Sequence, residues 1–278
     1  MDLEELEGLI RDHGLEAHRD AIVATVRPAI LLRLGEAGQG MAGESRIGGI
    51  PDLPDSLPWP TDPRLGRNLT FLLQIDLAAL PAFPGNPLPA AGMLYLFADE
   101  NEDDPQQLVL YTGSEPLRPR RPAPGAAFVT DWYDRLVPHR LLFDLVADVP
   151  RWATEDFYAL LQSLDGAHDE EDGLGDLGHA VSAAAVGKLL GHASGIGHDP
   201  REDAYVVREE NPAWLYDYQK RGTLDMSRAG RWHNLLEVDS TNEVNLMFGD
   251  AGYLQVLVHA DDLHRQDFSR VYVNLQSS

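Results

Sequence analysis

The sequence contains no cysteine, which excludes disulfide bonds, thiolate metal sites, iron–sulfur clusters and cysteine nucleophiles. It has only two lysines, Lys188 and Lys220, so arginine carries nearly all of the positive charge. No segment approaches the roughly 20 apolar residues that span a bilayer. The first residues, MDLEELEGLIRDHG, lack the basic head and apolar run of a secretory signal. We therefore expect a cytoplasmic protein that does not enter a membrane.

Basic residues are scarce relative to acidic ones. There are 22 Lys and Arg against 45 Asp and Glu, which gives a formal charge of −23 and a pI of about 4.6. Such a charge repels phosphate backbones and anionic lipids and speeds encounters with cationic partners. We expect no nucleic-acid ligand. Two interpretations of the acidity stay open, namely solubility alone and recognition of a basic protein, and the sequence does not define an oligomeric state.

The apolar pattern predicts an α+β fold. Stripes at helical spacing run through residues 3–10 and 17–26 and through 153–164. The segment 36–70 is so rich in Gly and Pro that we expect a long ordered loop, and the acidic run 168–179 resembles an exposed insertion. Strand-like segments, rich in leucine, β-branched and aromatic residues, occur at 29–36, 71–80, 92–100, 107–113, 140–150, 232–240, 249–263 and 270–276, with a helical turn near 261–267.

A degenerate internal repeat organises these segments. Aligning FLLQIDLAAL with NLLEVDSTNE places Gln74 on Glu237 and Asp76 on Asp239, and 92–97 and 47–51 then match 252–257 and 189–193. Short apolar strands also recur by chance, but three matches in the same order favour an internally duplicated antiparallel core. We therefore expect a single domain, 1–278, with N-terminal helices 1–27, lobe one about 29–113, a connecting segment 114–185 with a helix, and lobe two about 186–278.

Nine residues are candidates for ligand or partner binding, and each has a structural alternative. Backbone donors around Gly49 and Pro51 could wrap a ligand or form a turn. Trp59, between two prolines, offers a rigid aromatic surface or packs over the core. The remaining six candidates are Gln74, Asp76, His192, Glu237, Asp239 and Asp250.

The acids and amides among these candidates could act together or separately. Gln74, Asp76, Glu237 and Asp239 could converge as paired carboxylates for acid–base work or cation binding, or cap turns by accepting backbone N–H bonds. Asp250 fits a tight turn. His192 belongs to the nearest metal-like cluster, with His198, Asp199 and Asp203, but no H-E-x-x-H motif occurs. We expect no metal, no cofactor and no catalytic residue that the sequence can name.

Seven blocks together resemble the YwqG-like family, a bacterial domain of unknown function. The resemblance implies an α+β fold with a duplicated antiparallel core. It also implies a binding role, because some members lie beside toxin systems and have been proposed as immunity proteins. This chain departs from the pattern at Glu237, where glutamine is usual, and at Gly191-His192-Ala193, where the second Gly-Gly-Pro loop has decayed. The blocks are SRIGGIPDLPDSLPWP (45–60), FLLQIDLAALP (71–81), LPAAGMLYLFADE (88–100), KLLGH (188–192), LLEVDS (235–240), FGDAGYLQVLV (248–258) and DLHRQDFSRVYVNLQ (262–276).

Three functions are compatible with these observations. The first is an intracellular binding protein, plausibly an immunity protein that neutralises a cationic toxin, and the acidity and missing catalytic signature favour it over an enzyme. The alternative is an enzyme or small-ligand receptor with a site between the two lobes, built from the amide and carboxylate pairs. The third is a scaffold without a dedicated ligand.

Overall fold

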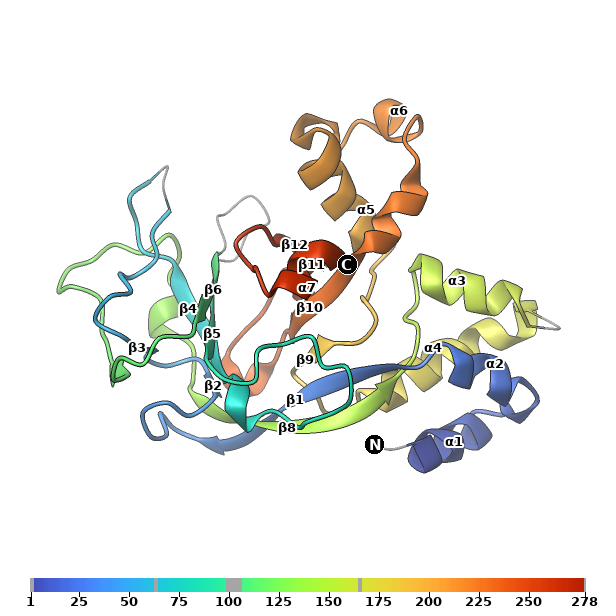
Figure 1. Cartoon of the computed structure of the whole chain (residues 1–278), viewed down its shortest axis with the longest axis horizontal. Coiled ribbons are helices and arrows are strands. Elements are labelled where there is room, and N and C mark those ends of the chain that lie inside the picture. The colour runs from blue at the N-terminus through green and yellow to red at the C-terminus, as the bar shows by residue number, and fades with distance from the viewer. Residues whose placement is uncertain (1–2, 63–64, 99–106, 165–166, 278) are drawn as a thin grey trace.

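The computed structural model describes residues 3–62, 65–98, 107–164 and 167–277. Its centre is one large, curled, ten-stranded antiparallel sheet with helices around it, so the predicted α+β class is confirmed (Figure 1). The strand order is β12-β11-β10-β9-β1-β8-β2-β4-β5-β6, and β3 and β7 form a separate pair. The strands are β1 (Arg27–Ala37), β2 (Arg46–Ile47), β3 (Asp52–Leu53), β4 (Thr70–Asp76), β5 (Met93–Ala98), β6 (Gln107–Tyr111), β7 (Arg118–Pro119), β8 (His139–Asp148), β9 (Gly187–Leu190), β10 (Trp232–Asp239), β11 (Tyr253–His259) and β12 (Tyr272–Gln276).

Seven α-helices accompany the sheet in the described ranges. Two of them match the predicted N-terminal stripes, and α3 begins at the N-cap Thr154, whose hydroxyl accepts from the backbone N–H of Phe157 at 3.3 Å. The first four helices lie together beside one end of β1 and β8, whereas α5 and α6 project away from the sheet (Figure 1). The helices are α1 (Leu3–Asp12), α2 (Arg19–Ala24), α3 (Glu155–Gln162), α4 (Ala167–Val181), α5 (Pro200–Tyr205), α6 (Tyr218–Arg221) and α7 (Ala260–Arg265).

The sheet has matching halves on either side of the central pair β1 and β8. On one side β8 is followed by β2-β4-β5-β6, and on the other β1 is followed by β9-β10-β11-β12. The register is the same in both halves, because Arg46 lies opposite Gln74 and Lys188 lies opposite Glu237. The next strand pair in each half also contains a register shift. In the pair β4 and β5 it lies between Phe71 and Leu73, and in the pair β10 and β11 it lies between Asn234 and Leu236.

The two faces of the curled sheet are covered differently. The inner face buries one apolar cluster that takes residues from both halves, such as Leu73 and Leu94 from one and Leu236 and Val256 from the other. The outer face is covered by separate clusters: one beneath α1 to α4, one beneath the segment 193–231, and one over β4 and β5. Polar side chains on the outer face are therefore buried where these coverings meet.

Two expectations about the chain are corrected or completed by the structure. The acidic run 168–179 is not an exposed insertion, because it belongs to α4. This helix buries Leu174, Leu177 and Val181, which share one helical face, while the acids lie on the rest of the surface. The sequence pattern predicts no helix or strand for residues 197–231. In the structure these residues fold into α5, α6 and short helical turns.

Candidate functional site

The first half of the sheet contains a buried polar network on its outer face. The guanidinium of Arg46 forms a buried ion pair with Asp52 and donates to the carbonyl oxygens of Gln39, at 2.8 Å, and Ile50, at 3.2 Å. The same Asp52 carboxylate accepts from Nε2 of Gln74 at 2.9 Å, and the Gln74 Oε1 accepts from the Asp52 backbone N–H at 2.8 Å. Burial lowers the pKa of Arg46 to about 10.

The turn that carries Gly49 and Pro51 is part of this network. The Gln39 side chain binds both the N–H and the C=O of Ile50, and the Tyr95 hydroxyl donates to the Asp52 carbonyl at 2.5 Å. Gly49 has φ of +76°, and an added Cβ would lie 2.8 Å from the Pro138 Cβ. The backbone groups of this turn are thus engaged within the fold, which fits the structural alternative for Gly49 and Pro51.

The second half repeats this arrangement with different side chains. Gln255 donates to the Ser194 carbonyl at 2.9 Å, as Tyr95 does to Asp52, and Ser194 Oγ donates to Glu237 at 3.1 Å. Gly191 has φ of +71°, and an added Cβ there would crowd Ala29 in the same way as an added Cβ at Gly49 would crowd Pro138. Lys188 occupies the position of Arg46, but its ammonium binds Asp148 at 3.3 Å instead of a residue of the turn.

Asp148 is the first centre of charge in the second half. Its fully buried carboxylate accepts from Arg151 at 2.6 Å, from the Lys188 ammonium and from the backbone N–H of His192 at 2.8 Å. Burial alone would raise the pKa of Asp148, but the charges of Arg151 and Lys188 hold it well below its ordinary value. Asp148 therefore stays ionised and joins β8, β9 and the turn that follows β9.

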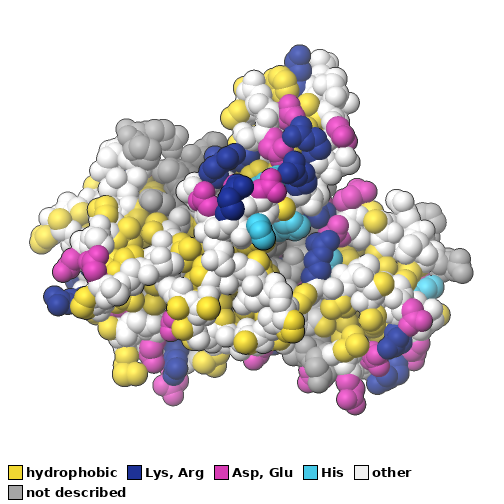
Figure 2. Space-filling model, in the orientation of Figure 1, with side chains coloured by type: hydrophobic (Ala, Val, Ile, Leu, Met, Phe, Trp, Pro, Cys, Tyr) yellow, Lys and Arg dark blue, Asp and Glu magenta, His cyan; other side chains and the backbone are white. Residues whose placement is uncertain are grey.

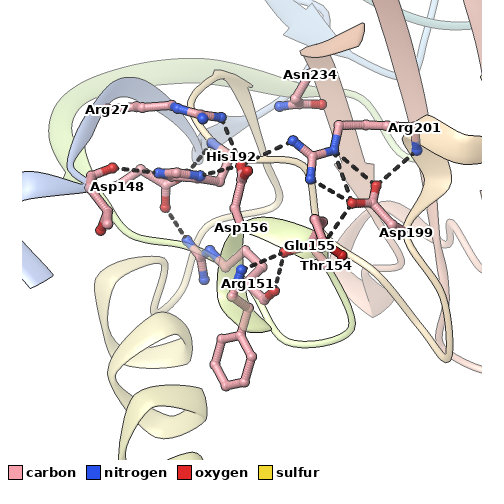
Figure 3. Close-up of polar contacts among 12 residues, drawn as sticks. Arg27, Asp148, Arg151, Thr154, Glu155, Asp156, His192, Asp199, Arg201 and Asn234 are labelled. Carbon is pink, nitrogen blue, oxygen red and sulfur yellow. Dashed lines mark hydrogen bonds and ion pairs between the residues drawn. The ribbon is translucent and has the colours of Figure 1, made fainter. Parts of the chain in front are cut away.

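Asp156, on α3, is the second centre. One oxygen of its carboxylate contacts Arg27 at 2.9 Å, His192 Nδ1 at 3.1 Å and Arg201 at 3.0 Å, and Figure 3 shows these three side chains converging on it. Burial would raise the pKa of Asp156, but the hydrogen bond with His192 and the two guanidinium groups lower it. His192 Nε2 lies 2.9 Å from the Thr25 carbonyl oxygen, so both ring nitrogens lie beside oxygen atoms.

Next to these centres, the outer face of β10 to β12 is polar and incompletely paired. Tyr253 Oη, Gln255 Oε1 and Asn274 Nδ2 are buried without a hydrogen-bond partner in the described ranges. Asp239 lies opposite Tyr253 in the register, and burial together with the nearby Glu237 raises the pKa of Asp239 to about 7. These groups make the outer face of β10 to β12 a buried polar layer with incomplete hydrogen bonding.

A cavity of about 520 Å³ opens where this face meets the projecting segment, and we call it the β12 pocket. Its wall includes the pair His198 and Asp203, joined Nε2 to Oδ2 at 2.7 Å, and Arg221, which donates to Asp203 at 2.6 Å. The hydrogen bond with Asp203 raises the pKa of His198. No Ser, Thr or Cys is among the described residues that line the pocket, and its side-chain hydroxyls belong to tyrosines.

The structure does not bring the four paired candidates together. Four strands separate β4, which carries Gln74 and Asp76, from β10, which carries Glu237 and Asp239, a path of roughly 24 Å along the sheet at the ordinary strand spacing. Asp76 instead accepts from the backbone N–H of Ala78 at 3.0 Å and caps a short helical turn. Glu237 and Asp239 remain neighbours on one face of their strand.

The other candidates have simpler surroundings. Trp59 is half-buried, donates from Nε1 to the Leu69 carbonyl at 2.9 Å and packs edge-to-face against Phe97 at 5.6 Å, as its core alternative predicts. Asp250 is exposed in the turn before β11. His192 is buried, and its two ring nitrogens contact the Thr25 carbonyl and the Asp156 carboxylate. It does not belong to a metal cluster among the described residues.

Sequence reasoning missed several residues of these networks. Lys188 carried a usable signal, because it is one of two lysines and interrupts an apolar strand. Asp199, which the sequence placed only in a metal-like cluster, carried another, since Asp-Pro at 199 and 200 is a helix start, and Asp199 indeed caps α5 and binds Arg201. Asp148, Arg151 and Asp156 follow ordinary strand and helix patterns, and only the fold places them together.

Two possible features are absent from the part of the chain that the structure describes. No group of three or more His, Cys, Asp and Glu side chains is placed to hold a metal ion, and no helix is long and apolar enough to cross a bilayer. The chain belongs to the family described as domain of unknown function DUF1963, whose model matches residues 45–277. No curated protein matches the sequence.

Proposed function

We propose that this member of the DUF1963 family is a binding protein whose partner is a basic protein, and that it serves as an immunity protein by covering the cationic surface of a toxin. The observation that supports this function is an acidic surface on α1, α2 and α4, which we call the acidic helical face. The net charge of the chain favours the same class of partner.

The acidic helical face is defined by exposed carboxylates on elements that pack together. Glu4 and Asp12 lie on α1, Glu16 lies in the turn before α2, and Asp172 and Asp176 lie on α4, and all five are exposed. The helices are held as a unit by their buried leucines and by His18 and Glu170, whose side chains lie 3.4 Å apart. The acids are thus carried by a packed surface that can meet a partner without prior ordering.

Positive side chains reduce this charge only slightly. Arg19 is paired with Glu7 and with Asp20, so it neutralises part of the face, and Arg11 is the other arginine on α1 and α2. By contrast, Figure 2 shows several Lys and Arg side chains close together on the projection that holds α5 and α6, with acids among them, while others are scattered over the rest of the visible face. The acidic helical face is therefore better suited to a cationic partner than the projection is.

A binding experiment with matched charge variants tests this function. The product of the neighbouring gene is titrated by calorimetry at 50 and 300 mM NaCl against the wild type and against the triple variant Glu4→Gln, Asp12→Asn, Glu16→Gln. We expect association at low salt, at least 10-fold weaker binding at high salt, and a comparable loss in the variant. The control neutralises Glu36, Asp131 and Asp134, which are exposed elsewhere, and should bind like the wild type. Equal losses in both variants would show that net charge alone is responsible, and salt-independent or absent binding would refute the proposed function.

We also infer that the two halves of the sheet descend from one duplicated unit. The support is the matched set of contacts: Gly49 and Gly191 approach the neighbouring strand in the same way, and Gln74 and Glu237 each bind the residue that ends the turn. Transplanting Gly48–Asp52 in place of residues 190–194 tests the equivalence. The chimera should keep the wild-type far-ultraviolet circular dichroism, and failure to fold would count against duplication.

A further inference from the structure

The two edge strands of the curled sheet line the walls of one cavity. β6 and β12 are the outermost strands in the order of the ten-stranded sheet, and the curl brings them back towards each other (Figure 1). A cavity of about 690 Å³ is lined by residues 108–110 of β6 and by residues 271–273 at the start of β12, and we call it the edge groove. It shares no lining residue with the acidic helical face, so a proposal about it goes beyond the proposed function and can fail separately.

Each of these two walls is a strand that pairs with another strand on one side only. β6 pairs with β5 and β12 pairs with β11, and within the described ranges no strand pairs with the other side of either. An edge strand presents a row of backbone N–H and C=O groups that serves as a template for a further strand. Because two such edges line one groove, a single extended chain in the groove can form a hydrogen-bonded ladder on both of its sides.

The direction of the strands determines how such a chain pairs. Every pairing along the ten-stranded sheet is antiparallel, so β6 and β12 run in opposite directions. A single strand between them is therefore antiparallel to one edge and parallel to the other. Both kinds of ladder satisfy the backbone groups, and mixed sheets are common among large sheets.

The groove is apolar on the side of the inner face of the sheet. Leu108, Phe268 and Val271 line it and belong to the inner apolar cluster, and Leu110 and Val273 line it and pack against that cluster. Successive side chains of a strand point to opposite faces, so every second side chain of an inserted strand would extend this cluster. The groove therefore favours a segment in which apolar residues alternate with others.

Charge favours basic residues at the ends of the segment and none at its centre. The described lining contains one cation, Arg208, whose guanidinium donates to the Val271 carbonyl oxygen at 2.6 Å, and one anion, the exposed Asp267. These two charges balance, so the segment inside the groove is best uncharged. The net charge of −23 repels acidic peptides and attracts basic ones, so the flanking residues are best basic.

We propose that the edge groove binds an extended peptide segment of a partner protein, with alternating apolar residues and basic flanks, which inserts as a further strand between β6 and β12. The backbone ladders supply affinity and the apolar side chains supply specificity, as in other complexes formed by β-strand addition. β6 and β12 have five residues each, so the paired segment is about five residues and roughly 17 Å long.

NMR titration of the ²H,¹⁵N-labelled full chain with synthetic peptides tests this proposal. The probe is a capped octapeptide in which valine alternates with threonine between terminal lysines. One control peptide has proline in place of a central threonine, which removes a backbone donor and fixes φ, and a second has glutamate in place of the lysines. We expect the lysine peptide to shift the backbone amides of residues 108–110 and 271–273 with a Kd of about 0.01 to 1 mM, and each control to bind about 10-fold more weakly at low salt.

Several results would overturn the proposal. These are no shift of these amides with about 2 mM lysine peptide, shifts confined to one of the two strands, and equal binding of the proline peptide. Equal binding of the glutamate peptide would overturn the preference for basic flanks. Shifts of the same amides that depend on protein concentration, without any peptide, would assign the groove to a second copy of the chain and would also overturn the proposal.

A variant in the wall and a matched control complete the experiment. Val273→Lys places a charge on the edge strand β12, which opposes further pairing, and should weaken the lysine peptide about 10-fold or more. Val137→Lys is the control, because Val137 is exposed and lies outside the groove lining, and it should bind like the wild type. If Val273→Lys fails to fold, the comparison of peptides on the wild type still decides. Unchanged affinity in folded Val273→Lys would overturn the assignment of β12 as a wall of the site.

Discussion

Removing the charge of Asp52 should destabilise the fold far more than removing that of a surface acid three residues away. Arg46 is 1% exposed and Asp52 is fully buried, so Asp52→Asn keeps the shape but leaves the guanidinium without its counter-charge. Breaking a buried pair on one side costs about 3 to 5 kcal/mol. The carbonyl oxygens of Gln39 and Ile50 still accept from Arg46, which places the expected cost near 3 kcal/mol.

Urea unfolding followed by circular dichroism measures this cost. The control is Asp55→Asn, because Asp55 is paired with Arg120 at 3.2 Å on the surface and its side chain is 80% exposed. Exposed pairs contribute about 0 to 1 kcal/mol, so the control should differ little from the wild type. A double variant, Arg46→Met with Asp52→Asn, should lose less than the sum of the single variants. A loss below 1 kcal/mol for Asp52→Asn would refute the view that this network holds the first turn closed.

Two further predictions concern the second half. Gly191→Ala should cost more than 2 kcal/mol, because the new Cβ would lie 2.4 Å from the Asp148 Oδ2, whereas Gly197→Ala, at φ of +81° but in open space, should cost only about 1 kcal/mol in the same unfolding assay. Asp203→Asn should lower the pKa of His198, measured by NMR titration of the ring protons, because the hydrogen bond with Asp203 is the main cause that raises it. An unchanged His198 titration would show that another group sets its charge.

The sequence identified the longer strands of the sheet because each depends on a local apolar pattern, but it predicted no strand at β2 or β9. The predicted segments at 29–36, 71–80 and 140–150 lie largely within β1, β4 and β8. The acidic run of α4 was misread because its acids were weighed above the buried spacing of Leu174, Leu177 and Val181. A helix with one apolar stripe can carry many charges on the remaining surface.

The candidate site was harder to predict because it depends on strand order. No local pattern indicates that β1 and β8 pair at the centre, and this pairing sets four strands between Gln74 and Glu237. The ion pairs around Asp148 and Asp156 join residues of β1, β8, α3 and β9 and of the segments that follow β8 and β9, which are distant in sequence. Long-range pairs of this kind follow from the assembled sheet and leave no periodic signal in the chain.

Comparing how the two halves pair their buried acids leads to a last prediction. In the first half the acid Asp52 faces its own cation, Arg46, and Gln74 is neutral, so the charges pair within one half. In the second half the acid is Glu237, which lies on the strand itself. The cation opposite it, Lys188, is bound by Asp148.

Glu237→Gln should therefore change the pH dependence of stability. Burial and the charge of Glu237 raise the folded pKa of Asp239 to about 7, so the folded state holds a proton that the unfolded state releases near pH 4. Stability consequently falls as the pH rises from about 4 to 7, by at most about 1.4 kcal/mol per pH unit. Because Glu237→Gln removes one of the two causes, it should lower the pKa of Asp239 and narrow the pH range over which stability falls. The variant should therefore regain on the order of 1 kcal/mol of stability at pH 8 relative to pH 5. Parallel stability profiles for wild type and variant would mean that the two carboxylates do not interact, and the polar face of β10 to β12 would then be explained by burial alone.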